Sequence, residues 1–65
     1  MAVGRNIKAQ RKRRSLTQEE LGHRAGLHAV EVGRAERGVR DMRVSTVFKL
    51  ARGLDVPPME LFRDV

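Results

Sequence analysis

The sequence predicts an all-α fold, with five short helices forming one compact domain over residues 1–65. Apolar residues recur with the period of amphipathic helices, and no strand-like alternation persists. Glycines and the Pro57-Pro58 pair separate the helical segments. A chain of about 60 residues buries only about 60% of its unfolded surface, so we expect a single small core.

The first helix is expected at residues 3–14, with Val3, Ile7 and Arg11 on its inner side. Its basic residues account for the whole net charge of +6, because basic and acidic groups balance in the rest of the chain. They are Arg5, Lys8, Arg11, Lys12, Arg13 and Arg14. Such a segment is either an ordinary solvated helix face or a surface for an anionic partner.

The second helix is expected to begin at Gln18, because Thr17 and Glu20 have the spacing of a capping box. Leu16 and Leu21 occupy the hydrophobic staple positions around that cap. The helix should end at Gly26, a residue type that readily adopts the left-handed conformation that closes helices. Leu27 then follows at the position that packs back onto the helix end.

The third helix is expected at residues 29–36 and should stop before Gly38. Two short helices joined by a tight glycine-containing turn cross steeply and form a helix-turn-helix. Val32 and Ala35 should face inward. The outer side then carries Ala29, Val30, Gly33, Arg34 and Arg37. A slim helix with this surface fits the major groove of DNA, which is about 12 Å wide.

Each of these positions has a functional and a structural interpretation. Arg34 could donate a bidentate pair to guanine. Ala29 and Val30 could touch thymine methyl groups or simply pack at the helix start. Gly33 could mark a tight packing contact or allow a close approach to the groove floor. Glu31 could accept from cytosine, but a surface pair with Arg34 is favoured.

The fourth helix is expected at residues 44–53 and a short fifth helix at residues 58–62. The inner stripe of the fourth helix is Val44, Val47, Leu50, Ala51 and Leu54. Four further apolar residues exceed what so small a core need enclose, and form a possible dimer contact: Phe48, Met59, Phe62 and Val65. Ordinary core packing is the alternative for all four, and is favoured for Phe48.

The composition argues against several function classes. The sequence has no cysteine, and His23 and His28 lack the spacing of a helical metal pair, so we expect no metal, no cofactor and no enzyme activity. With only two aromatic residues, the chain lacks the stacking platform of single-strand binders, which favours double-stranded DNA as the nucleic-acid partner. No signal peptide or membrane span is expected, and the cytoplasm, with the nucleoid, is the expected location.

Two long segments, GRNIKAQRKRRSLTQEELGHRAGL and VGRAERGVRDMRVSTVFKLARGLDV, resemble the Cro/C1-type (XRE) helix-turn-helix family of phage and bacterial repressors. The resemblance covers nearly the whole chain without a gap. It implies a lambda-repressor-like DNA-binding domain with the helix-turn-helix formed by the second and third helices. It also implies that Arg11 and Glu36 form a buried structural ion pair.

The resemblance assigns roles to individual residues. Gln18, with Thr17 beside it, matches the family's anchor on the DNA backbone and bases. The third helix supplies base readers, and basic residues after it follow the backbone or the minor groove. Together with the residues singled out above, the candidate DNA-binding set is Thr17, Gln18, His28, Ala29, Val30, Gly33, Arg34, Arg37, Arg40 and Arg43.

The sequence departs from the family pattern at several helix ends. His28 replaces the usual Ser or Thr cap of the third helix, and Met42-Arg43 replaces the usual Pro-Ser/Thr before the fourth. Asp55 and Gly22 stand where Gly and Ala are common, respectively. We therefore expect looser ends on the second and fourth helices and a lower stability than in a typical member.

These features predict a stand-alone transcriptional regulator that binds double-stranded DNA sequence-specifically. It is expected to act as a repressor and homodimer on a palindromic operator with half-sites about one helical turn, 10–10.5 bp, apart. The alternative is an antitoxin or a restriction-modification controller protein that also binds a protein partner.

Overall fold

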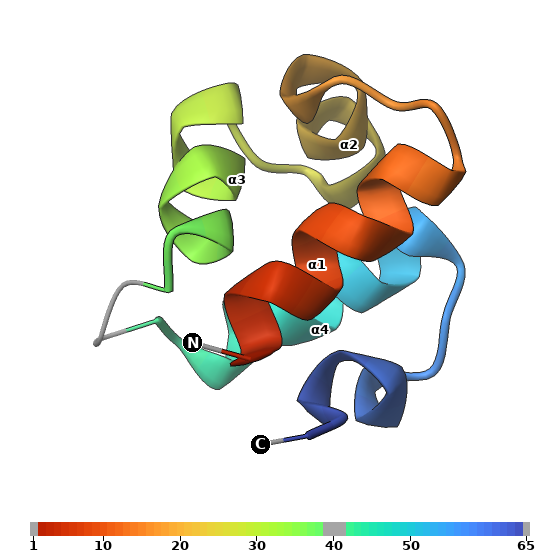
Figure 1. Ribbon diagram of the computed structural model, residues 1–65. Helices are drawn as coiled ribbons and strands as arrows, with labels where there is room; N and C mark the ends of the chain where they lie inside the picture. The colour runs from red at the N-terminus through yellow and green to blue at the C-terminus, as the bar shows by residue number, and fades with distance from the viewer. Residues whose placement is uncertain (1, 39–41, 65) are drawn as a thin grey trace.

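The computed structural model describes residues 2–38 and 42–64. It contains four α-helices and one 3-10 helix, and the described residues include no strand. The helices are α1 (Ala2–Arg13), α2 (Gln18–Ala25), α3 (Ala29–Glu36) and α4 (Val44–Leu54), followed by the 3-10 helix η1 (Pro58–Phe62). In Figure 1, α1 crosses in front of α4, while α2 and α3 form the upper and left sides.

The all-helical prediction is confirmed, but the prediction of five helices is wrong for the last element. Residues 58–62 form a 3-10 helix in which the Glu60 amide donates to the Pro57 carbonyl at 2.9 Å. Proline has no amide hydrogen to donate, and so short a segment is typical of the tighter i to i+3 pattern. The described part of the chain therefore has four α-helices.

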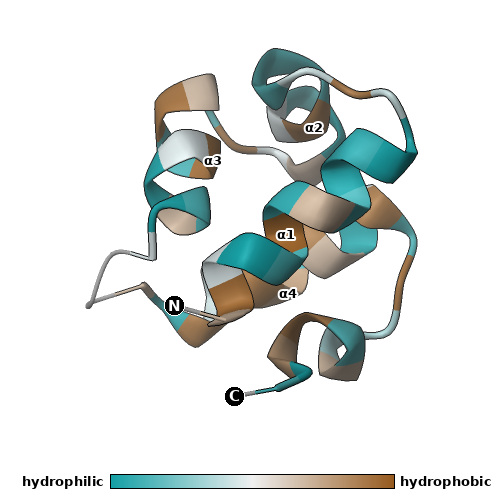
Figure 2. Cartoon of the chain, in the orientation of Figure 1, coloured by the Kyte–Doolittle hydropathy of each residue, from teal (hydrophilic) through white to brown (hydrophobic). Residues whose placement is uncertain are grey.

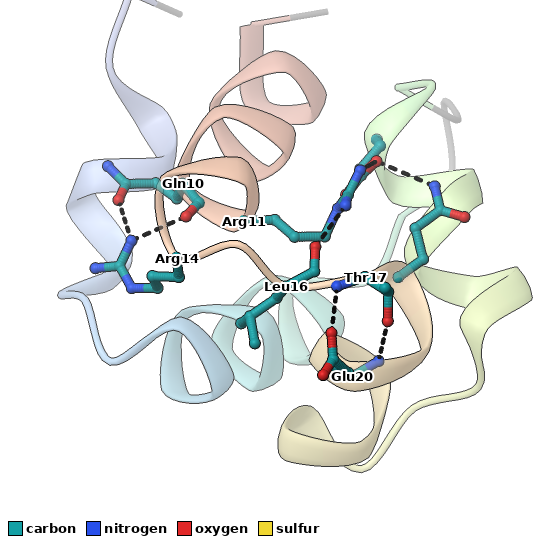
Figure 3. A network of polar contacts seen from close by, with 8 residues as sticks. Gln10, Arg11, Arg14, Leu16, Thr17 and Glu20 are labelled. Atoms are coloured by element: carbon teal, nitrogen blue, oxygen red, sulfur yellow. Dashed lines mark hydrogen bonds and ion pairs between the residues drawn. The ribbon is translucent and has the colours of Figure 1, made fainter.

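The predicted capping box at the start of α2 is present. The Glu20 amide donates to Thr17 Oγ1 at 3.0 Å, and the Thr17 amide donates to Glu20 Oε1 at 2.8 Å (Figure 3). The hydrogen bond from the Thr17 amide is the largest cause that lowers the pKa of the Glu20 carboxyl, because it favours the charged form. The start of α2 is thus fixed by strictly local interactions.

The turn between α2 and α3 closes as the sequence predicts. Gly26 has φ of 73°, in the left-handed region, and the Leu27 amide donates to the Gly22 carbonyl at 2.8 Å. This hydrogen bond is the long one of a Schellman motif. Gly22 therefore has a packing role that its departure from the family pattern did not suggest: an added Cβ would lie 2.5 Å from the Leu27 carbonyl oxygen.

The ends of α4 match the expectation of weak capping. Its N-cap, Arg43, makes no side-chain capping hydrogen bond. Its C-cap, Asp55, has φ of 58°, in the left-handed region that favours glycine. Both features follow from the residues that replace the family's usual caps.

The core lies where the four α-helices and η1 meet. It is built from Val3, Ile7, Leu21, Ala25, Val32, Ala35, Val47, Leu50, Ala51, Leu54 and Leu61. Helix α2 packs against α3 and α4, while α1 packs against α3 and η1. Figure 2 shows that the C-terminal half of α1 is largely hydrophilic on the outside. None of the described helices is long and apolar enough to cross a membrane.

A backbone contact between α1 and α3 sets the spacing of these helices. Gly4 is buried, and an added Cβ would lie 2.5 Å from the Glu36 carbonyl oxygen and 2.7 Å from that of Ala35. The sequence analysis gave Gly4 no role, because only the folded arrangement brings these residues together. The missing side chain lets α1 press directly on the end of α3.

Candidate nucleic-acid interface

Helix α3 presents the side predicted to meet DNA. Val32 and Ala35 are buried beneath it, as expected. On the outside, Val30 is 63% exposed and Arg34 and Arg37 are also exposed. Ala29 is partly buried, so its side chain contributes to packing as well as to the surface. The exposed part of α3 is therefore partly apolar, with the acidic Glu31 in its first turn and the basic Arg34 and Arg37 toward its C-terminal end.

Gly33 is covered by side chains on the outer side of α3 and is not exposed there. Gly33 is buried, and a Cβ built on it would lie 3.4 Å from Arg37 Nη1 and 3.6 Å from both polar atoms of the Gln18 amide. These are ordinary contacts, so the tight packing considered for Gly33 is absent as well. The long side chains of Gln18 and Arg37 cover this position instead.

The ion pair between Arg11 and Glu36 lies behind this surface. Arg11 donates to the Glu36 carboxylate from Nε at 2.5 Å and from Nη2 at 3.1 Å. A third hydrogen bond runs from Arg11 Nη1 to the Leu16 carbonyl at 2.7 Å (Figure 3). The hydrogen bonds to Glu36 raise the pKa of the Arg11 guanidinium. One side chain thus connects α1, the loop before α2 and the end of α3.

Gln18 joins the same cluster from the start of α2. Its Nε2 donates to Glu36 Oε1 at 3.1 Å, so the Glu36 carboxylate accepts from two different helices. The sequence analysis assigned Gln18 to DNA but did not find this partner. The two residues are 18 positions apart, and no local pattern joins them. Only the helix-turn-helix geometry brings them into contact.

At the start of α3, the surface pair between Glu31 and Arg34, the favoured interpretation of Glu31, is absent from the described part of the chain. The His28 amide donates to Glu31 Oε2 at 3.3 Å, so this carboxylate turns back to the helix start. Within the described residues, Glu31 makes no ion pair with Arg34. His28 itself is exposed at the N-cap. Glu31 therefore closes the first turn of α3 in place of the missing hydroxyl cap.

A hollow between α3 and the start of α4 brings together basic residues from both helices. Arg34, Arg43 and Lys49 line it, with the His28 end of α3 at its edge. Arg34 and Arg43 are among the residues predicted from the sequence, whereas Lys49 is not, because a single lysine on a helix that also carries Arg52 gives no distinct signal. The predicted role of Arg40 lies outside the described residues.

Apolar side chains are exposed on α4 and η1. Phe48 is 52% exposed and Met59 is 81% exposed, and Phe62 is also exposed. Core packing, the favoured alternative for Phe48, is therefore wrong. Val44, predicted for the inner stripe, is exposed too, because α4 begins there and its first turn extends past the core. Val65 lies outside the described residues.

In the described residues, no group of three or more His, Asp or Glu side chains is arranged to hold a metal ion. The cluster of Arg11, Gln18 and Glu36 instead connects α1, α2 and α3. Candidate DNA contacts lie on or next to α2 and α3: Thr17, Gln18, Arg34 and Arg37.

Residues 7–61 match the protein family described as Helix-turn-helix. The chain is 39% identical over 59 residues to the uncharacterized HTH-type transcriptional regulator y4dJ of Sinorhizobium fredii, covering 91% of this chain and 77% of that protein. It is 34% identical over 53 residues to the control protein C.SmaI of Serratia marcescens, covering 82% and 63%.

Solved structures show the same arrangement. The restriction-modification controller protein C.AhdI from Aeromonas hydrophila superposes with a TM-score of 0.88 at 38% identity, covering 94% of this chain and 92% of that one. The P22 c2 repressor in complex with a synthetic operator superposes with a TM-score of 0.85 at 25% identity, covering 100% and 98%.

Proposed function

This chain belongs to the helix-turn-helix family of the Cro/C1 (XRE) type, and on that premise we propose that it is a sequence-specific DNA-binding transcriptional regulator that acts as a repressor. The observation that carries the proposal is the exposed, basic side of α3, presented beside the capped start of α2. A similar structure was solved with operator DNA bound. The sequence-specific role falls to α3, because a helix of this width fits the major groove.

The candidate contacts divide into two kinds. Val30 and Arg34 extend from α3 where they can reach base edges, and Arg34 can pair with guanine. Thr17, Arg37 and Arg43 flank α3 and suit the phosphate backbone, where contacts supply affinity without reading sequence. Lys49 joins Arg43 in this second group, because both line the hollow beside α3.

We further propose that the 65-residue unit is a single DNA-binding domain that works as a homodimer on a palindromic operator. Two copies would place two α3 helices about one helical turn of DNA apart. Phe48, Met59 and Phe62 are exposed apolar residues on elements other than α2 and α3, and they suit a contact between copies. The cytoplasmic nucleoid is the corresponding location.

A second candidate function is that of a restriction-modification controller protein, alone or with a protein partner. The similarity to C.AhdI favours it, since that protein is named a restriction-modification controller, and C.SmaI is named a control protein. Both candidates require DNA binding through the same surface. They are distinguished by the neighbouring genes: a restriction endonuclease and methyltransferase beside this gene would favour the controller.

The proposal is tested by selecting binding sites from random duplex DNA and titrating the selected duplex with salt. A two-fold motif with half-sites about one helical turn apart, and affinity that falls steeply with salt, is the expected result. Weak binding without sequence preference would overturn the proposal. A pull-down from the source cells would then search for a protein partner.

A further inference from the structure

The Gln18 side chain is held in one orientation by a charged cluster behind the DNA-binding surface. Glu36 Oε1 accepts from Gln18 Nε2 and from Arg11 Nη2, each at 3.1 Å. Glu36 Oε2 accepts from Arg11 Nε. The Glu36 side chain is only 4% exposed, so water competes little for these hydrogen bonds.

The chemistry of the cluster decides which end of the amide faces inward. A carboxylate paired with a guanidinium has acceptors only, so the group of Gln18 that meets it must be the NH2. The amide oxygen, Oε1, is left without a hydrogen-bond partner among the described residues. Every buried polar side-chain atom in those residues has a hydrogen-bond partner. The Oε1 atom, which has none, is therefore not buried and is open to a ligand.

An open carbonyl oxygen selects its partner by charge. It is repelled by a phosphate oxygen and attracted to an N–H donor. The donors at base edges in the major groove are the N6 amino group of adenine and the N4 amino group of cytosine. Gln18 lies beside Gly33 of α3, next to the helix that reads the groove.

We propose that Glu36 is a positioning residue that fixes Gln18 with its nitrogen inward and its oxygen outward, so that Gln18 accepts a hydrogen bond from the amino group of an adenine or a cytosine. The inference rests on the proposed function. It gives the Gln18 amide oxygen a base-edge partner, and leaves the second N–H of Nε2 available to the DNA backbone.

The first test uses the duplex selected from random DNA as its probe. Each adenine is replaced in turn by purine, and each cytosine by 2-pyrimidinone, so that only the amino group is removed. In the wild type, one such deletion per half-site should weaken binding about 3- to 10-fold, as expected for one hydrogen bond. In Gln18→Ala the same deletion should cost less than about 2-fold.

The purine replacements test an adenine partner for Gln18, and the 2-pyrimidinone replacements test a cytosine partner. If no deletion in either arm loses its effect in Gln18→Ala, the acceptor role is overturned. Failure of the wild type to select any motif would instead overturn the proposed function, so the two failures are distinguishable.

The positioning role is tested with Glu36→Gln, whose amide lets the Gln18 side chain turn around. The amino-group penalty should fall below about 2-fold in this variant, because the bond is no longer oriented. Glu31→Gln is the matched control and should keep the full penalty: it removes the same charge from the same helix, and among the described residues the Glu31 carboxylate accepts a hydrogen bond only from the His28 amide. An unchanged penalty in Glu36→Gln would overturn the positioning role.

A measurement on the wild type covers the case in which Glu36→Gln does not fold. Nuclear magnetic resonance should detect a scalar coupling across the hydrogen bond between Gln18 Nε2 and the Glu36 carboxyl carbon, with slow exchange of that amide proton. Absence of the coupling together with fast exchange would overturn the orientation assigned to Gln18.

Discussion

The helix-turn-helix, formed by α2 and α3, and the α4–η1 end of the molecule hold their polar groups in different ways. Behind the helix-turn-helix, the Arg11–Glu36 pair between α1 and the end of α3 has side chains that are only 11% and 4% exposed, and it makes further hydrogen bonds to Leu16 and Gln18. At the other end, the Arg63–Glu60 pair spans 3.6 Å with side chains 66% and 42% exposed.

The capping of the helix ends also differs between the two regions. Helix α2 starts with a complete capping box, whereas α4 has no side-chain cap at its start and a left-handed aspartate at its end. The α4–η1 end also carries exposed apolar residues, including Phe48 and Met59. This small chain fixes the orientation of its reading helix through charged and capping side chains at several points. The η1 segment is held to α1 by hydrogen bonds from Asn6 Nδ2 to the Leu61 and Arg63 carbonyls, at 3.1 and 2.7 Å, and its exposed apolar residues remain open to a partner.

The largest expected effect is a difference in stability loss when each of the two ion pairs is broken. Glu36→Ala leaves the Arg11 guanidinium nearly buried without its partner, which should lower the free energy of unfolding by about 3 kcal/mol. Arg63→Ala removes an exposed pair and should cost less than about 0.5 kcal/mol. Urea denaturation followed by circular dichroism measures both. Equal losses would contradict the division between the two regions.

The next effect concerns the contact between α1 and α3. Gly4→Ala places a methyl group against backbone carbonyl groups that have no flexible side chain to move, so it should destabilise the fold by about 1–3 kcal/mol. Ala2→Ser, in the same first turn of α1 but less buried, is the control. Thermal unfolding of both variants measures the difference. A Gly4→Ala variant as stable as the wild type would show that the spacing of α1 and α3 is adjustable.

A smaller effect compares the starts of α2 and α4. Thr17→Ala removes a working cap and should destabilise the protein by about 1 kcal/mol. Arg43→Ser adds a hydroxyl where α4 has no side-chain cap and should stabilise it by a similar amount, about 0.5–1 kcal/mol. Opposite signs in urea denaturation are expected. A loss of stability in both variants would mean that Arg43 supports α4 in some other way.

The smallest effect is a pH dependence at the α2 cap. The pKa of Glu20 is lowered in the folded state, so its stabilising effect is present above the unfolded-state pKa and is lost as pH falls through the folded pKa. Glu20→Gln should therefore be less stable than the wild type at neutral pH, and the difference should shrink in acid. Urea denaturation from neutral to acidic pH measures it. A difference independent of pH would contradict the role of the charged carboxylate.

The sequence predicts the local features of the site well. Thr17, Glu20 and Gly26 act within one or two turns of chain, so their spacing alone places α2 and the turn after it. The contacts of Gly4 and Gln18 with Glu36 escaped prediction because each joins residues far apart in the sequence. They depend on how the helices cross.

The errors concern residues whose exposure was inferred from the sequence without knowing which side chains pack around them. The helical period predicts that Gly33 is exposed on the outer side of α3, but the side chains of Gln18 and Arg37 cover it. Core packing was the favoured alternative for Phe48, yet the small core is filled by aliphatic residues and Phe48 is exposed. Periodicity indicates a helix face but not what lies over it.

The central claim, that α3 reads bases while the residues around it hold the backbone, is tested most directly at Arg34. Binding of wild type, Arg34→Ala and Arg43→Ala is compared on the selected operator and on a set with each base pair substituted singly. Arg34→Ala should lose its preference at one base pair per half-site, a cost of about 1–3 kcal/mol, whereas Arg43→Ala should weaken all duplexes alike and lower the salt slope by about 1. An unchanged preference in Arg34→Ala, or a base-selective loss in Arg43→Ala, would contradict the account.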